Sequence, residues 1–224
     1  KSTYMDKEKT ITSGRDLSGF THVLRDSRVL VLSVASMFGG LVFSGLIGAT
    51  LGHFLRHRYG LEFDIVSITF GVATITGFAL GLKSFAEVLV GPFGGYFSDR
   101  YGRYKSLVIS AALTSIGLFI LGFSSTLLIT ITVLLLVFIT GVMMMMQLLS
   151  LVGMAVNEES RSQVFSVFNT FQDFGSALGP LIGLSLISAN LLPALYSISG
   201  ILLFILIMAA CLFLSKNMVS TDPH

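Results

Sequence analysis

Three charged residues stand inside long apolar stretches of this sequence: Lys83, Glu87 and Asp173. A charge near the centre of a lipid bilayer costs about 2.5–3.5 kcal/mol on insertion scales, so such residues normally face protein or water. Lys83 and Glu87 are four residues apart, which places them on one face of a helix, where they can form an ion pair. A carboxylate whose surroundings change between conformations can take up and release a proton.

The two acidic residues lie at matching distances from the charged ends of their stretches. Asp99 follows Glu87 by twelve residues, and Arg161 precedes Asp173 by twelve residues. At 1.5 Å per residue, this spacing is about 18 Å along a helix. The sequence therefore predicts that both acids lie near the middle of a membrane, the depth at which transporters place substrates and coupling ions.

Two roles remain open for these charges. In the first, Glu87 or Asp173 is a coupling residue that gains and loses a proton. In the second, the charges are static, with Lys83 paired to Glu87. Asp173 would then bond polar neighbours such as Asn169.

The elements that carry these charges are predicted to be membrane-spanning helices. Charged residues make up 12% of the chain, against roughly 25% in soluble domains. A helix needs about 20 apolar residues to cross the hydrocarbon core, and no stretch shows the period-two alternation of a strand. We expect an all-α membrane protein with six such helices, at residues 29–52, 66–97, 106–123, 127–154, 163–187 and 191–214.

Basic residues gather on one side of this predicted bundle. Only Arg56 and Arg58 fall on the opposite side. Because basic loops stay in the cytoplasm, we expect a plasma (inner) membrane protein with two cytoplasmic tails, 1–28 and 216–224, around a bundle at 29–215. The basic residues on the cytoplasmic side are Lys1, Lys7, Lys9, Arg15, Arg25, Arg28, Arg100, Arg103, Lys105, Arg161 and Lys216.

A Gly-Pro pair occurs in both the second and the fifth predicted helix. Gly91-Pro92 and Gly179-Pro180 are each followed by a glycine at the same offset, Gly95 and Gly183. Glycines allow close helix approach, and the two helices run in opposite directions. The pattern predicts an inverted repeat of three plus three helices, with chance recurrence as the alternative.

A charged turn separates the second and third predicted helices. It resembles the loop motif G-x-x-x-D-R-x-G-R-[RK] of the major facilitator superfamily, except that Tyr104 stands where a second basic residue is usual and Lys105 follows it. The resemblance implies that this turn acts as a conformational latch between two halves. The matching residues are Gly95, Asp99, Arg100, Gly102 and Arg103.

The resemblance covers about residues 25–215 and implies a half-bundle of a fold that normally has twelve helices. The polar tail that begins at Lys1 is similar to the central loop of the family, which favours the C-terminal half of a longer protein. The latch motif is more typical of the N-terminal half. The implied partners are the lipid bilayer, a small-molecule solute, and either the other six-helix half or a second copy of this chain.

The implied function is secondary active transport of a small solute by alternating access, with proton coupling as an option. A non-transporting scaffold or receptor-like protein is the alternative. In the family, the first and fourth helices of each half line the cavity. The cavity candidates are therefore Phe38, Phe43 and Gln147, together with Asn169 and Gln172.

Several functional classes find no support in the motifs. The sequence lacks a phosphate-binding Gly-rich loop and the H-E-x-x-H and G-x-S-x-G signatures, so we expect no enzyme. One cysteine, Cys211, and four scattered histidines have no metal-ligand spacing. We expect no metal, no cofactor and no nucleic-acid partner.

Overall fold

The computed structural model describes residues 25–65, 68–156, 158–187 and 191–219. Within these ranges, the side chains at 62–69, 91–92, 94–95, 99, 159 and 217–219 lie outside the description. The elements are α2 (Ser27–Gly40), a π-helical segment (Leu41–Ile47), α3 (Gly48–Tyr59), β1 (Glu62–Ile65), β2 (Ile68–Gly71), α4 (Val72–Tyr101), α5 (Arg103–Phe123), α6 (Leu127–Met154), a short 3₁₀ turn (Glu158–Ser160), α7 (Arg161–Ile187) and α8 (Leu192–Val219).

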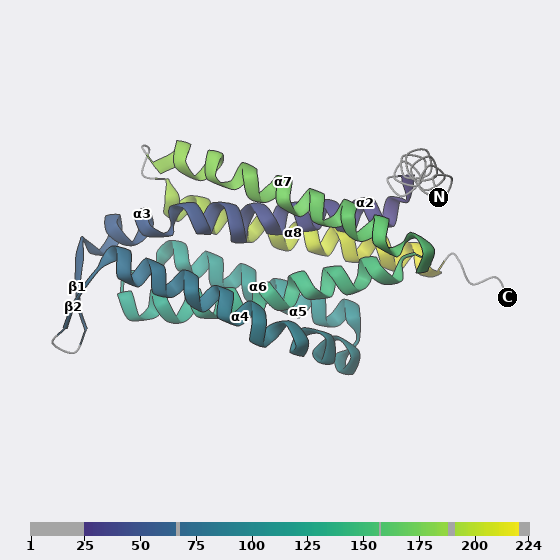
Figure 1. Ribbon diagram of the computed structural model, residues 1–224, viewed down its shortest axis with the longest axis horizontal. Helices are drawn as coiled ribbons and strands as arrows, with labels where there is room; N and C mark the ends of the chain where they lie inside the picture. The colour runs from purple at the N-terminus through teal and green to yellow at the C-terminus, as the bar shows by residue number, and fades with distance from the viewer. Residues whose placement is uncertain (1–24, 66–67, 157, 188–190, 220–224) are drawn as a thin grey trace, which may run out of the picture.

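The helices form six rods, each running opposite to the one before it in the chain, and the first rod joins α2, the π-helical segment and α3 end to end (Figure 1). The first rod packs on α7, and α4 packs on α6 in the same way. α5 packs on α8. If the first, second and third rods are exchanged with the fourth, fifth and sixth in that order, the same three pairs result. The inverted repeat stays a prediction, and the pairing of the rods supports it.

The start of α2 and the end of α8 lie at the same end of the bundle, which we call the terminal end (Figure 1). The turn from α4 to α5 and the connection from α6 to α7 also lie there, and the β-hairpin lies at the opposite end. The described basic residues of the predicted cytoplasmic side therefore belong to one physical end of the molecule, whereas Lys1, Lys7, Lys9 and Arg15 of the predicted tail lie outside the described residues. Which face of the membrane this end occupies stays a prediction.

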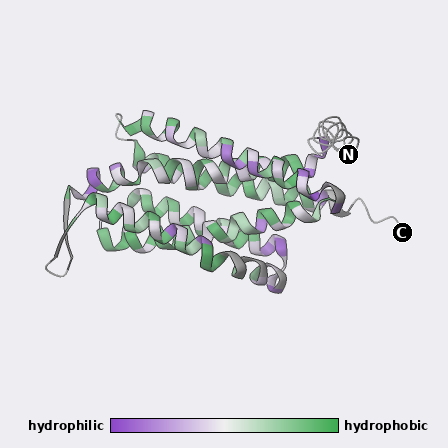
Figure 2. Cartoon of the chain, in the orientation of Figure 1, coloured by the Kyte–Doolittle hydropathy of each residue, from purple (hydrophilic) through white to green (hydrophobic). Residues whose placement is uncertain are grey.

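Apolar residues cover most of the length of the bundle (Figure 2). Among the described residues, five helices are long and apolar enough to cross a membrane: Ser27–Tyr59, Val72–Val90, Arg103–Phe123, Leu127–Met154 and Leu192–Lys216. The all-α membrane class is thus confirmed. The sixth predicted span is helix α7, whose 27 residues are enough to cross a bilayer. Helix α7 is not one of the five apolar helices because its exposed face carries polar side chains.

Two element boundaries differ from the sequence prediction. The second helix begins at Val72 rather than at residue 66, because β1 and β2 form an antiparallel hairpin that pairs Phe63 with Phe70. β-branched and aromatic residues favour this local pairing. The first rod also continues past residue 52 to Tyr59. This extension of about two turns carries the buried core residues Phe54 and Leu55 among polar and charged residues.

Glycines allow the first rod and α7 to touch backbone to backbone. A Cβ atom added at Gly179 would overlap backbone atoms of Leu41, Gly45 and Leu46. A Cβ atom at Gly183 would meet the Thr50 side chain at 2.5 Å. Two of the predicted packing residues, Gly179 and Gly183, therefore lie in the closest helix contact of the bundle.

Proline and the π-helical segment lie beside the same contact. Pro180 is inside α7 and lacks the N–H that would complete the helical hydrogen bonding. The π-helical turns stand directly opposite. The side chains of the other predicted packing pair, Gly91-Pro92 on α4, lie outside the description.

Candidate functional site

A pocket of about 100 Å³ opens on the side of the bundle between the first rod, α4, α6 and α7. It combines apolar and aromatic side chains with one amide and one pair of opposite charges, the usual composition of a small-molecule site, although its volume is below the roughly 300–1,000 Å³ of such sites. We call it the central pocket. Its lining residues are Gly39, Gly40, Phe43, Ser44, Lys83, Glu87, Phe138, Gly141, Val142, Met145, Met146 and Gln172.

An ion pair stands on the α4 side of the central pocket. Lys83 Nζ lies 3.3 Å from a carboxylate oxygen of Glu87. The lysine side chain is 18% exposed and the glutamate side chain 47% exposed, so a solute or proton reaches the carboxylate more easily than the ammonium. The structure thus brings together the two charges that the i, i+4 spacing predicted.

An aromatic ring and an amide complete the opposite wall. Phe43 comes from the π-helical segment and is 7% exposed. Its ring fills the space above Gly141, where a Cβ atom would overlap ring carbons at 2.5–3.1 Å. Gln172 is half-buried on α7 and lines the same pocket. Two predicted cavity residues, Phe43 and Gln172, therefore lie in one site with the ion pair.

The pocket lies at the mid-depth of the bundle. Phe43 is at the midpoint of the first rod, Ser27–Tyr59, and Glu87 is at the middle of α4, Val72–Tyr101. A rod that crosses a bilayer evenly carries its midpoint near the midplane. The position of Glu87 near the bilayer midplane stays a prediction, which its place at the middle of α4 supports.

Gln147 does not line this pocket, in contrast to the sequence prediction. The residue is 1% exposed and turns toward α5. There its Oε1 accepts a hydrogen bond from Ser110 Oγ at 2.6 Å, and its Nε2 donates to Ser106 Oγ. Met145 and Met146 line the pocket, and Gln147, the next residue, is rotated by about a further 100° around the helix axis. Gln147 instead joins two helices through a buried polar contact.

Replacing Gln147 with leucine is expected to lower stability by about 1–2 kcal/mol, because two buried hydroxyls lose a partner inside the membrane. The thermal midpoint can be followed with a maleimide dye that reacts with the buried Cys211 on unfolding. The matched control is Met146→Leu, in the pocket, which should leave the midpoint unchanged. Equal midpoints for Q147L and the wild type would contradict the assignment.

Three further candidates lie outside the central pocket. Phe38 is partly buried and packs against the hydrophobic core. Asn169 and Asp173 are exposed on α7, four residues apart and therefore on one helix face. Asp173 thus lies next to the pocket residue Gln172 along the chain, on a different side of the helix.

The latch turn lies at the terminal end, between α4 and α5. Gly102 adopts φ 87° and ψ 135°, a backbone conformation that residues with a Cβ atom rarely adopt. Arg100 Nη1 donates to the Tyr96 hydroxyl at 3.3 Å. The side chains of Gly95 and Asp99 lie outside the description, and Arg103 is half-buried at the start of α5.

Replacing Gly102 with alanine should destabilise the protein by about 1–3 kcal/mol through backbone strain. Added bulk has no part in this effect, because no atom lies within 4 Å of the position of the new Cβ. Gly77→Ala is the control, since it is equally open and its backbone is helical. The Cys211 dye assay measures both variants. Equal midpoints for G102A and G77A would contradict the strain.

Sequence reasoning missed Gly141, which makes room for the ring of Phe43. Apolar residues surround this position in the sequence, so no pattern marked it. In the part of the chain that the structure describes, no group of three or more histidine, cysteine or acidic residues gathers to hold a metal ion.

Comparisons with known proteins give a consistent picture. A family model described as the Major Facilitator Superfamily matches residues 69–223. Multidrug resistance protein MdtH of Photorhabdus laumondii is 27% identical over 186 residues, which cover 81% of this chain and 44% of that protein. A Na(+), Li(+), K(+)/H(+) antiporter of Planococcus maritimus is 27% identical over 138 residues, which cover 58% of this chain and 32% of the antiporter.

The chain spans less than half the length of these two relatives. The family match itself covers more than half of the chain, including five of its six rods and the latch turn. The helical membrane bundle is consistent with this family match. The chain therefore belongs to the major facilitator superfamily.

Proposed function

We propose that this chain is one six-helix half of a secondary transporter that moves a small solute across the plasma membrane by alternating access. The central pocket carries this proposal. It lies at mid-depth, four of the six rods contribute to it, and an ion pair stands in its wall. Secondary transporters bind their substrates and coupling ions near the bilayer midplane.

The chemistry of the pocket indicates the kind of solute. Phe43, Met145 and Met146 offer an adaptable apolar surface. Gln172 and Glu87 add an amide and a half-exposed carboxylate. Such a wall suits a small molecule with an apolar body and a hydrogen-bond donor or positive charge. The relative named for multidrug resistance is in keeping with an adaptable site.

Proton coupling is part of the proposal. Glu87 is accessible from the pocket, and Lys83 holds it in a fixed place, so a solute or a proton can compete for the carboxylate. Asp173, exposed on α7, is the second candidate. One relative is named as a cation/proton antiporter, and this name supports coupling in the present chain.

A second bundle is proposed to cover the face of α4 and α7. Only 22% of the apolar window of α4 is buried, against 44–61% for the other four candidate spans. Asn169, Thr170 and Asp173 lie exposed on α7, although polar groups at membrane depth normally face protein or water. The other six-helix half, or a second copy of this chain, would bury the apolar surface of α4 and would give the polar residues of α7 a protein surface to face.

Reconstitution of the whole protein in liposomes tests this function. We expect a panel of small cationic and neutral amphiphiles to include a solute that accumulates against its gradient when a pH gradient is imposed. A protonophore should abolish the accumulation. Binding without any flux would instead favour a non-transporting scaffold, and flux that ignores the protonophore would remove the proton coupling alone.

A further inference from the structure

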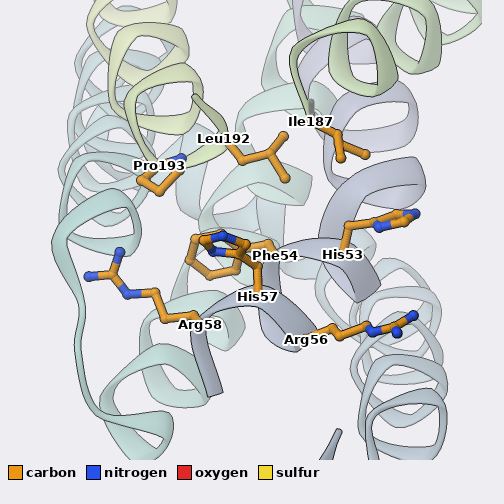
Figure 3. Close-up of a pocket in the computed structure, with 8 residues that line it drawn as sticks. All are labelled: His53, Phe54, Arg56, His57, Arg58, Ile187, Leu192 and Pro193. Carbon is orange, nitrogen blue, oxygen red and sulfur yellow. The ribbon is translucent and has the colours of Figure 1, made fainter. Parts of the chain in front are cut away.

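A second and larger pocket lies at the end of the bundle opposite the terminal end. Its volume is about 310 Å³. Figure 3 shows Arg58 and Arg56 on opposite flanks, with His57 and Phe54 between them. We call it the basic pocket. Its lining residues are His53, Phe54, Arg56, His57, Arg58, Ile187, Leu192 and Pro193.

The basic pocket has an excess of positive charge. Its rim carries two arginines and two histidines, and none of its lining side chains that the structure describes is acidic. The C-terminus of α3 contributes about half a negative charge, which offsets less than one of the two arginines. Arg58 Nη1 donates a hydrogen bond to the Gly122 carbonyl oxygen at 3.5 Å, and this bond orients the guanidinium. The pocket therefore attracts an anion.

The depth of the pocket matches lipid headgroups. The first rod has 33 residues and is about 50 Å long at 1.5 Å per residue. The hydrocarbon core is about 30 Å thick, so about 10 Å of the rod extends beyond it at each end. The stretch from His53 to Arg58 lies within the last six or seven residues, at the level of phosphate groups.

The inner wall of the pocket is apolar. Ile187 ends α7, and Leu192 and Pro193 begin α8. With Phe54, which is 2% exposed, they form a hydrocarbon surface directly beside the cationic rim (Figure 3). A charged rim next to an apolar wall fits an amphiphile better than it fits a free ion.

We propose that the basic pocket binds an anionic phospholipid, with its phosphate at the cationic rim and the start of its acyl chains on the apolar wall. Basic pockets between membrane helices on the cytoplasmic side bind anionic headgroups, and we place the same chemistry at the opposite end of this bundle. The proposal concerns a site outside the central pocket and does not depend on the transport function.

Native mass spectrometry of the purified protein tests the proposal with defined lipids. Phosphatidylglycerol should bind in preference to phosphatidylcholine with the same acyl chains. The double variant R56Q/R58Q should weaken phosphatidylglycerol binding about thirtyfold, because each basic residue contributes appreciably at a membrane surface. The matched control K105Q/K216Q removes two exposed basic residues at the terminal end and should leave binding unchanged.

Three outcomes would overturn the proposal. One is equal binding of the two lipids by the wild type, and another is equal loss of binding in the two double variants. The third is binding of glycerol phosphate as tight as that of the lipid, which would identify a free anion as the occupant. If R56Q/R58Q fails to fold, R56Q alone replaces it, since Arg56 is exposed.

Discussion

Replacing Gly179 with alanine is expected to destabilise the bundle by about 3 kcal/mol. The new Cβ atom would overlap backbone atoms of Leu41, Gly45 and Leu46. Backbone cannot rotate out of the way as a side chain can, so the first rod and α7 must separate along their contact. The thermal midpoint of the G179A variant, measured with the Cys211 dye assay, reports the loss.

Gly48→Ala is the matched control for this prediction. Gly48 begins α3, three residues after Gly45 on the same rod, and a Cβ atom there meets nothing within 4 Å. Its substitution should leave the midpoint unchanged or raise it slightly, since alanine favours the helix. If G179A were as stable as G48A, the close contact between the first rod and α7 would be wrong.

Replacing Glu87 with glutamine is expected to lower solute flux about tenfold. A factor of this size corresponds to the free energy of one charge-assisted hydrogen bond. The variant should also lose the dependence of flux on pH, because its amide cannot gain or lose a proton. Flux across reconstituted liposomes at a series of pH values measures both effects. Asp173→Asn tests the second coupling candidate, which lies outside the central pocket.

A double variant separates coupling from static pairing. In E87Q alone, Lys83 keeps its charge without the carboxylate that lies 3.3 Å away, which can itself impair the protein. K83Q/E87Q removes both charges. Under the coupling hypothesis, the double variant stays insensitive to pH. Recovery of wild-type flux with its full pH dependence would instead identify the pair as purely structural.

The sequence predicted the features of this chain that follow from spacing along one helix. The i, i+4 relation of Lys83 and Glu87 led to the ion pair. The glycines Gly179 and Gly183 predicted a close helix approach, and the structure identifies the first rod as the partner. Three apolar spans, predicted at 106–123, 127–154 and 191–214, lie within three residues of their observed bounds. Each of these inferences needs only the geometry of a single element.

Features that depend on the rotation of one helix against another were not predictable. Gln147 and Met146 are neighbours in an apolar run, yet only Met146 lines the central pocket. A turn of about 100° separates adjacent residues of a helix, and α6 is apolar all round, so nothing in the sequence fixes its rotation. The basic pocket was missed because it joins the end of α3 to α8, which is more than 130 residues away.

The most direct test of the account is the accessibility of the central pocket from each face of the membrane. Met146 lines the pocket and can be replaced with cysteine in a background where Cys211 is serine. A membrane-impermeant maleimide is then applied to right-side-out and to inverted vesicles. Alternating access predicts labelling from both faces, with the transported solute changing the ratio. Labelling from one face alone, whatever solute is present, would contradict it.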